Sequence, residues 1–206
     1  MAQKAMMHPH FIFNVINSIQ HFINAGDKQA ANVYLVDFAK LIRMSAAFSE
    51  KSLVNLAEEM AYLNLYLSFE KLRFGDNLRY EIIVNPTIEL EEKSIAVMMI
   101  QPFLENAIWH GILPMNANGH VTLKMDLESD TLLKVSIADN GLGIKEIFIS
   151  NNLLDPIHEN QEHCIAIQRL KHLANHSSEK LYMRYKHMHP EKANKGTIAE
   201  FLLPTV

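Results

Sequence analysis

Apolar residues in the first third of the chain recur at the spacing of amphipathic helices. One run covers Phe11 to Asn24 and ends at Gly26-Asp27, a second covers Gln29 to Phe48, and a third covers about Ala57 to Phe74. Apolar positions three and four residues apart predict a helix with one apolar face in each run. The first two helices would form a hairpin whose apolar faces need a partner to cover them. A homodimer that completes a four-helix bundle is therefore the natural hypothesis.

The pattern changes at Phe74-Gly75, where apolar and polar residues begin to alternate with the period of a half-buried strand. The predicted strands are Leu78 to Val84, Gly119 to Leu127, Leu132 to Ala138, Leu181 to Tyr185 and Thr197 to Leu203. Helical runs over Leu90 to Ile112 and over Cys164 to about His176 separate them. This order predicts an α+β protein, with a helical region over residues 1–74 and a two-layer sandwich of helices on a mixed sheet over residues 75–206.

Polar residues interrupt the apolar face of the predicted helix over Leu90 to Ile112. Glu105, Asn106 and His110 stand among apolar residues that recur at helical spacing. A carboxylate and an amide on a mostly apolar helix are costly to bury without partners. They are either satisfied buried polar residues or groups that face a hydrated cation and a polyanion, and this stretch alone favours neither.

Composition and charge exclude several classes of protein. The chain of 206 residues has a net charge of −4 and no long basic run, so nothing in it favours binding to nucleic acid. Its single cysteine, Cys164, excludes an intramolecular disulfide and suits a reducing compartment. No apolar run reaches the roughly 18 residues that span a bilayer, and no signal peptide precedes the first helix. The abrupt start indicates a piece of a longer protein, whose upstream part is a candidate membrane sensor.

An acidic residue followed by glycines ends the strand over Leu132 to Ala138. In Asp139-Asn140-Gly141-Leu142-Gly143, a buried carboxylate can accept a hydrogen bond from an exocyclic amine such as that of adenine. The glycines allow a ligand to approach the backbone closely. A strand end closed by a tight Asx turn is the alternative. Gly196-Thr197, which opens the last strand, is on its own an ordinary turn.

The order of these motifs is more specific than any one of them. Three stretches, in this order, resemble the N box and the glycine boxes of the Bergerat, or GHKL, ATP-binding fold. They are Gln101-Pro102-Phe103-Leu104-Glu105-Asn106-Ala107-Ile108-Trp109-His110-Gly111, then Asp139 to Gly143, then Gly196-Thr197. Near the N-terminus, His8-Pro9-His10-Phe11-Ile12-Phe13-Asn14 is similar to the phosphoacceptor motif of LytS-type sensor histidine kinases. The resemblance extends from about Ala5 to Pro204.

The resemblance implies that residues 75–206 bind ATP. Asp139 would bind the adenine amine, Gly141 and Gly143 would line the nucleotide pocket, and Thr197 would support Asp139 or a water beside adenine. His110 would lie near the phosphates or close its helix through a bond to a carbonyl group.

The resemblance also implies phosphoryl transfer to His10. Asn106 would ligate a Mg²⁺ ion that bridges the phosphates, and Glu105 would orient water or the metal shell. Neutral imidazole is a nucleophile near pH 7 because its ordinary pKa is about 6.5, and the transfer needs positioning and charge neutralisation by Mg²⁺. Asn14, one helical turn after His10, is expected to hydrogen-bond the second ring nitrogen and set the tautomer. His8 is the rival acceptor, but it stands where the family usually has asparagine.

The segment that would form the lid over ATP departs from the family. Relatives often carry His-x-Ser-x-Gly-x-x-x-Thr-x-x-Arg, whereas this chain keeps His158 and Arg169 but has Asn160, Glu162 and Ala166 at the serine, glycine and threonine. Arg169 would reach a phosphate. Glu162 in place of the lid glycine adds bulk and negative charge beside a polyanion.

The sequence therefore predicts the cytoplasmic transmitter part of a LytS-type sensor histidine kinase, within a full-length protein anchored in the membrane. It would form a homodimer, phosphorylate itself on His10 from Mg²⁺-ATP and pass the phosphoryl group to the receiver domain of a response regulator. It would contact neither nucleic acid nor membrane itself. The alternative is a non-catalytic pseudokinase scaffold whose altered lid no longer closes on ATP. A GHKL ATPase without phosphotransfer is a third alternative, against which the His-Phe-Ile-Phe-Asn motif argues.

Overall fold

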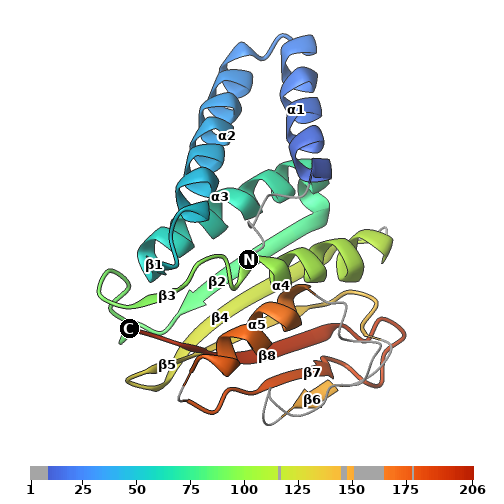
Figure 1. The fold of residues 1–206 in the computed structure, drawn as a ribbon. Coiled ribbons are helices and arrows are strands. Elements are labelled where there is room, and N and C mark those ends of the chain that lie inside the picture. The colour runs from blue at the N-terminus through green and yellow to red at the C-terminus, as the bar shows by residue number, and fades with distance from the viewer. Residues whose placement is uncertain (1–8, 116, 145–147, 151–164, 178) are drawn as a thin grey trace.

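The computed structural model describes residues 9–115, 117–144, 148–150, 165–177 and 179–206. Its first helices, α1 (Pro9–Asn24) and α2 (Lys28–Ser49), form a hairpin that stands out from the rest of the molecule (Figure 1). The side chain of Asp27 accepts a hydrogen bond from the Ala30 amide at 3.0 Å and so caps α2. The first two predicted helices are confirmed.

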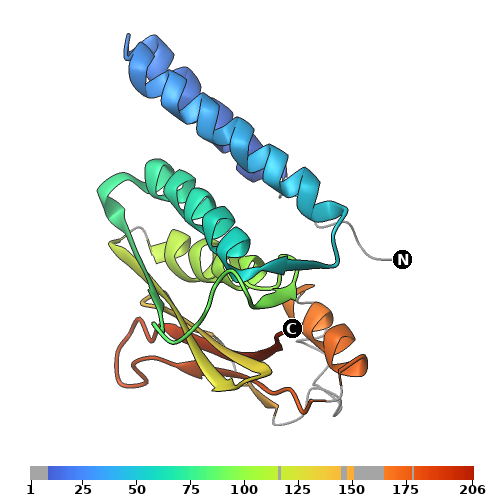
Figure 2. The same cartoon turned by 90° about the vertical axis from the view of Figure 1, so that its left-hand side faces the viewer.

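The third helix, α3 (Leu56–Phe74), lies between the hairpin and the rest of the molecule (Figure 2). Asn55 caps it by accepting a hydrogen bond from the Glu58 amide at 2.7 Å. Gly75, at φ 60°, ends it in a conformation that glycine tolerates, and a short 3₁₀ turn (η1, Gly75–Asn77) leads to the sheet. This predicted helix is also confirmed. Among the described residues, no helix is both long and apolar enough to cross a membrane.

A six-stranded mixed sheet forms the base of the C-terminal part. The strands, in the order in which they pair, are β2 (Leu78–Val84), β4 (Gly119–Ser129), β5 (Leu132–Asp139), β8 (Thr197–Pro204), β7 (Met183–His187) and β6 (Phe148–Ser150). The strands β2 and β4 run parallel, and the other neighbours run antiparallel. The predicted strands are confirmed, except that β7 begins at Met183 instead of Leu181 and that β6 was not predicted.

Helices cover one face of this sheet (Figure 1). The inward residues of the central strands are buried, and α4 (Gln101–Asn106) and α5 (Ile165–Asn175) pack over them. Phe103 of α4 stacks on Phe201 of β8 with ring centroids 4.1 Å apart. The predicted α+β fold, with helices layered on one face of a mixed sheet, is confirmed.

The other face of the sheet carries charged side chains. Glu200 of β8 pairs with Lys134 of β5 at 3.6 Å and with Arg184 of β7 at 3.7 Å. Lys124 and Asp126 pair at 2.8 Å on β4. This alternation of apolar inward and charged outward positions is typical of a sheet with one solvated face.

The predicted helix over Leu90 to Ile112 is wrong in its first half. Ser94–Ala96 form a strand, β3, that pairs antiparallel with β1 (Leu53–Asn55), and neither strand was predicted. The helix α4 begins only at Gln101. Pro102 explains the late start, because proline lacks an amide hydrogen and fits only the first turn of a helix.

The second half of the predicted helix is present but irregular. After α4, residues Ala107–Ile112 widen into a π-helical turn (η2), and Leu113–Met115 form a 3₁₀ turn (η3). Single π-helical turns inside helices occur frequently at functional sites.

Candidate functional site

Asp139 is a buried carboxylate at the end of β5. Its side chain is 3% exposed, and its Oδ1 accepts a hydrogen bond from the Gly141 amide at 2.8 Å. Thr197, the first residue of β8, lies opposite Asp139 in register and is also buried. Burial raises the pKa of Asp139 from 3.8 to about 6, against the Gly141 amide and the Thr197 amide and hydroxyl, which lower it. The Asx turn that the sequence offered as an alternative is therefore present, and it holds a carboxylate that is costly to ionise.

Glycines let separate backbone segments converge on this carboxylate. A methyl group on Gly111 would lie 2.8 Å from Oδ1 of Asp139. A methyl group on Gly141 would overlap the backbone of Gly111, and one on Gly196 would overlap the carbonyl oxygen of Asp139. The Leu142 amide donates to the Gly111 carbonyl at 3.0 Å, and the Gly196 amide donates to the Gly141 carbonyl at 2.9 Å. Only glycine therefore fits at these three positions around Asp139.

The sequence did not single out Gly111 and Gly196 as residues of this site. Each lies inside a motif of the resemblance, Gly111 at the end of the N-box stretch and Gly196 before the last strand, but neither was predicted to bind the nucleotide. Gly143, which was predicted, lies in the same loop as Gly141 at φ 86°, a conformation that favours glycine.

The helix that carries Glu105 and Asn106 ends beside Asp139. Gly111 lies five positions after Asn106, roughly 6–8 Å along the helix axis. Glu105 is half-buried and accepts a hydrogen bond from the Gln101 amide nitrogen at 2.7 Å, which makes it a satisfied polar residue. Asn106 is half-buried, and His110 is exposed. The predicted roles of these residues toward a metal ion and phosphates stay predictions.

A second polar cluster joins η2 to α3. Glu70, 1% exposed, accepts hydrogen bonds from the Tyr66 hydroxyl and the Trp109 indole nitrogen, each at 3.2 Å. The Arg73 guanidinium lies 4.2 Å from the centre of the Trp109 ring and 3.5 Å from the Glu70 carboxylate. Burial raises the pKa of Glu70, against Arg73 and its two hydrogen-bond donors. Tyr66, Glu70 and Arg73 lie close together on α3, but the bond from Trp109 to Glu70, 39 positions apart, was not predicted from the sequence.

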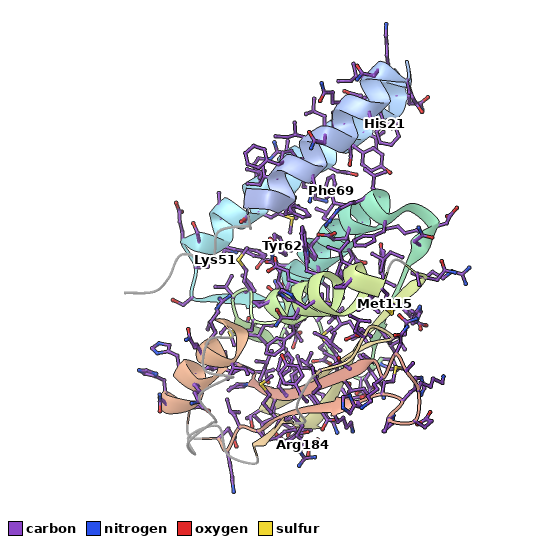
Figure 3. All side chains as sticks on the ribbon, turned by 90° about the vertical axis from the view of Figure 1, so that its right-hand side faces the viewer. His21, Lys51, Tyr62, Phe69, Met115 and Arg184 are labelled. Atoms are coloured by element: carbon purple, nitrogen blue, oxygen red, sulfur yellow. The ribbon has the colours of Figure 1, made fainter. Side chains whose placement is uncertain are left out.

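His10 lies in the first turn of α1. Its neighbour Phe11 packs on α3, with its ring centroid 5.1 Å from that of Tyr66 and 6.2 Å from that of Phe69. Figure 3 shows Phe69 at the junction between the hairpin and α3. The side chain of His10 and all of His8 lie outside the described residues, so the bond from Asn14 and the choice of acceptor stay predictions.

Arg169 reaches from α5 to the segment that precedes α4. Its two terminal nitrogens donate hydrogen bonds to the carbonyl groups of Met98 and Val97, both at 2.7 Å. A phosphate contact, as the sequence predicts, would have to be made in place of these bonds or from another rotamer. The departures from the family at Asn160 and Glu162 lie outside the described residues.

The structure brings Asp139, Gly141, Gly143 and Thr197 together at one end of the sheet. It also places the end of the helix that carries Asn106 against them. A buried acceptor beside closely approachable backbone suits a ligand with an amine group, such as a purine nucleotide. A histidine in the first turn of a helical hairpin, joined through α3 to such a site, is the arrangement that the resemblance to histidine kinases implies.

Comparisons with known proteins agree with this class. A family model described as histidine kinase matches residues 1–78. The sensor protein LytS of Oceanobacillus iheyensis is 28% identical over 98% of this chain, and the sensor protein kinase HptS of Staphylococcus aureus is 29% identical over 95% of it. The matches cover 33% and 36% of those two proteins, so the chain spans about a third of their length. The chain is therefore similar to LytS-type sensor histidine kinases over nearly its whole length, and the resemblance that its motifs indicated is confirmed.

Solved structures of histidine kinases are similar at low identity. The mycobacterial sensor histidine kinase MprB has a TM-score of 0.47 and 17% identity, over 74% of this chain and 96% of its own. The histidine kinase domain of the blue-light-activated kinase from Erythrobacter litoralis has a TM-score of 0.48 and 15% identity, over 95% of this chain and 92% of its own. The likeness to LytS-type kinases rests on the sequence relatives alone.

Proposed function

We propose that the chain is the transmitter part of a sensor histidine kinase, which binds Mg²⁺-ATP beside Asp139 and transfers the γ-phosphoryl group to His10. The observation that carries the proposal is the buried Asp139 carboxylate, against which the backbones of Gly111 and Gly141 converge. Burial disfavours the ionised form of such a carboxylate, and a hydrogen bond from an amine favours it. The exocyclic amine of adenine is a donor of that kind.

The residues around Asp139 fit a nucleotide. Asp139 would accept from the adenine amine, Thr197 would support the carboxylate, and the backbone of Gly141 and Gly143 would lie against the ligand. No three His, Cys, Asp or Glu side chains gather as metal ligands in the described part of the chain. Mg²⁺ would therefore depend on Asn106 and on the phosphates themselves, where it supplies charge neutralisation.

His10 would be the nucleophile of the transfer. Its unprotonated ring nitrogen forms a bond to the γ-phosphorus, while the bond from that phosphorus to the β,γ-bridging oxygen breaks and ADP leaves with the electron pair. The Asn14 side chain would hold the N–H of the other ring nitrogen and so fix the tautomer. An aspartate in the receiver domain of a response regulator would then take the phosphoryl group, in the cytoplasm, beneath a membrane-anchored sensor part.

Incubation with Mg²⁺ and γ-labelled ATP is expected to give protein-bound label that is labile in acid and stable in base. Replacing His10 by glutamine should abolish the label, because the amide is not a nucleophile. His21→Gln is the matched control, since His21 is an exposed histidine on the same helix and should leave labelling unchanged. Label that persists in His10→Gln would exclude His10 as the acceptor.

The altered lid favours one alternative, a non-catalytic scaffold. Glu162 puts a negative charge where relatives carry glycine, and that charge opposes the phosphates. If the wild-type chain gives no label and calorimetry detects no nucleotide binding, the scaffold is favoured, and Glu162→Gly is then expected to restore binding. Binding and hydrolysis of ATP without label would favour an ATPase.

The hairpin carries apolar side chains that the chain itself leaves exposed, which supports a homodimer. They include Phe13, 65% exposed, Ile16, Ile23, Val33 and Val36. Three of them, Phe13, Ile16 and Ile23, recur at helical spacing on α1. Contiguous apolar surface of this kind marks an interaction site, and a second hairpin would bury it in a four-helix bundle.

Analytical ultracentrifugation at micromolar concentration is expected to show a dimer. The double variant Ile16→Glu, Val36→Glu should be a monomer, because each association would bury the new carboxylates without partners. Asn17→Glu, at an exposed polar position of α1, is the control and should remain dimeric. A wild-type chain that is monomeric at this concentration would contradict the proposed bundle.

A further inference from the structure

Glu59 is a fully buried carboxylate that the proposed transfer does not use. It lies in the first turn of α3, is 0% exposed, and accepts a hydrogen bond from the Met98 amide through Oε2 at 3.3 Å. Its other oxygen, Oε1, has no hydrogen-bond partner among the described residues. Burial raises the pKa of Glu59 to about 7, against the amides of Met98 and Ile100 and the charge of Arg169. A group this costly to bury calls for a reason beyond packing.

Met98 is the residue that Glu59 holds, and its backbone is strained. Among the described residues it is the only one other than glycine with a positive φ, at 54°. Residues with a Cβ rarely adopt this backbone conformation, and it persists only when the surroundings enforce it. The Met98 side chain is 2% exposed, so the segment cannot relax toward solvent without losing buried apolar area.

Arg169 binds the same residue through its carbonyl group. Its guanidinium spans two consecutive carbonyl groups, those of Val97 and Met98, at 2.7 Å each. The planar fork of arginine fits two acceptors at once, which the single ammonium of lysine does not reproduce. Two helices therefore bind the backbone of Met98. Glu59 of α3 binds its amide, and Arg169 of α5 binds its carbonyl group.

We propose that Glu59 and Arg169 are positioning residues for the nucleotide site, which act by clamping Val97–Met98. The inference rests on the proposed function and adds residues to it. Met99 and Ile100 join the clamped segment to α4, and the Ile100 carbonyl accepts a hydrogen bond from the Phe103 amide at 3.1 Å. The orientation of α4 sets where Asn106 lies, and the end of the same helix meets Asp139. The clamp therefore links two helices to α4, which bears Asn106. One is α3, which carries the hairpin, and the other is α5, which follows the predicted lid segment.

The test uses the conservative variants Glu59→Gln and Arg169→Lys. The controls are Glu58→Gln, whose side chain is 41% exposed, and Arg79→Gln at an exposed position. Two readouts are taken on the full chain. The first is hydrogen–deuterium exchange of the α4 amides without nucleotide. The second is the affinity for Mg²⁺-ATP by calorimetry. Emission of Trp109, the single tryptophan, gives an independent optical signal from η2.

Both clamp variants are expected to speed exchange across α4, to shift Trp109 emission and to weaken Mg²⁺-ATP binding by about tenfold, because misplaced binding groups lose affinity steeply. The double variant should be little worse than either single one, because the two residues act on one segment. Wild-type exchange in both variants would overturn the clamp. Weaker binding in Arg169→Lys with unchanged α4 exchange would also overturn it and assign Arg169 to a phosphate.

The exchange readout keeps this proposal separate from the proposed function. If the wild-type chain binds no nucleotide, the proposed kinase activity fails, and faster α4 exchange in Glu59→Gln and Arg169→Lys still establishes the clamp. If the wild-type chain binds nucleotide and the variants exchange and bind as it does, the clamp fails and the kinase proposal stands.

Discussion

Replacing Asp139 by asparagine is expected to raise the dissociation constant for Mg²⁺-ATP by at least about 100-fold, the loss typical of a buried acceptor replaced by a donor. The change puts an NH₂ group in place of one carboxylate oxygen, so that a donor faces either the amine of adenine or the amide of Gly141. Calorimetry or a fluorescent nucleotide measures the loss. Asp130→Asn is the matched control, because Asp130 is exposed in the turn between β4 and β5. Near wild-type affinity in Asp139→Asn would contradict the proposed site.

The same variant has a pH signature. Burial raises the pKa of Asp139 from 3.8 to about 6. The folded chain therefore binds more protons than the unfolded chain between these values, and the contribution of Asp139 to the free energy of unfolding falls as pH rises through this window. The Asp139→Asn variant lacks this pH-dependent loss of stability. Its free energy of unfolding should therefore increase relative to that of the wild type by about 1–2 kcal/mol from pH 5 to pH 7.5, measured by urea denaturation. A constant difference across this range would show that Asp139 titrates normally.

Replacing Gly141 by alanine is expected to lower the free energy of unfolding by about 2–3 kcal/mol, as overpacking does at tightly packed positions. The added methyl group would overlap the backbone of Gly111 and press on Oδ1 of Asp139. Moving the loop away from Gly111 would also separate the two backbones that converge on the carboxylate, so nucleotide binding should be lost as well. Urea denaturation and calorimetry measure both effects.

Gly26→Ala separates this clash from backbone strain. Gly26 has φ 78° and open space where a methyl group would lie, so alanine there costs only the conformational strain, about 1 kcal/mol. Nucleotide binding should be unaffected, because Gly26 lies in the turn between α1 and α2. Equal losses of stability in the two variants would show that Gly141 is not confined as the structure describes.

The sequence predicted most of the elements because their apolar faces are local signals. The helices α1, α2 and α3 and the strands β2, β4, β5 and β8 each carry a clear period of 3.6 or 2 over their own length. The segment over Leu90 to Ile100 failed because its apolar residues also fit helical spacing. What decides its structure is pairing with β1, about 40 residues earlier, and the limit that Pro102 sets on the start of α4.

The same difference between local signals and contacts of distant residues applies to the candidate site. Asp139, Gly141 and Thr197 were found because their motifs are contiguous in sequence, and the structure brings them together at the strand ends. The contacts of Glu59 with Met98 and of Glu70 with Trp109 were not predicted, since each joins residues 39 positions apart. Arg169 was singled out, but it donates its hydrogen bonds to the Val97 and Met98 carbonyl groups. No local pattern in the sequence predicts these bonds.

The charged face of the sheet has a consequence for how copies of the molecule associate. Two such sheets cannot stack against each other without stripping water from Glu200 and its partners Lys134 and Arg184, and the cost of removing water from these ions opposes that contact. The exposed apolar residues of α1 and α2 carry no such cost. Association by sheet stacking is thus disfavoured, which leaves the end of the molecule that bears the hairpin as the surface for the proposed dimer.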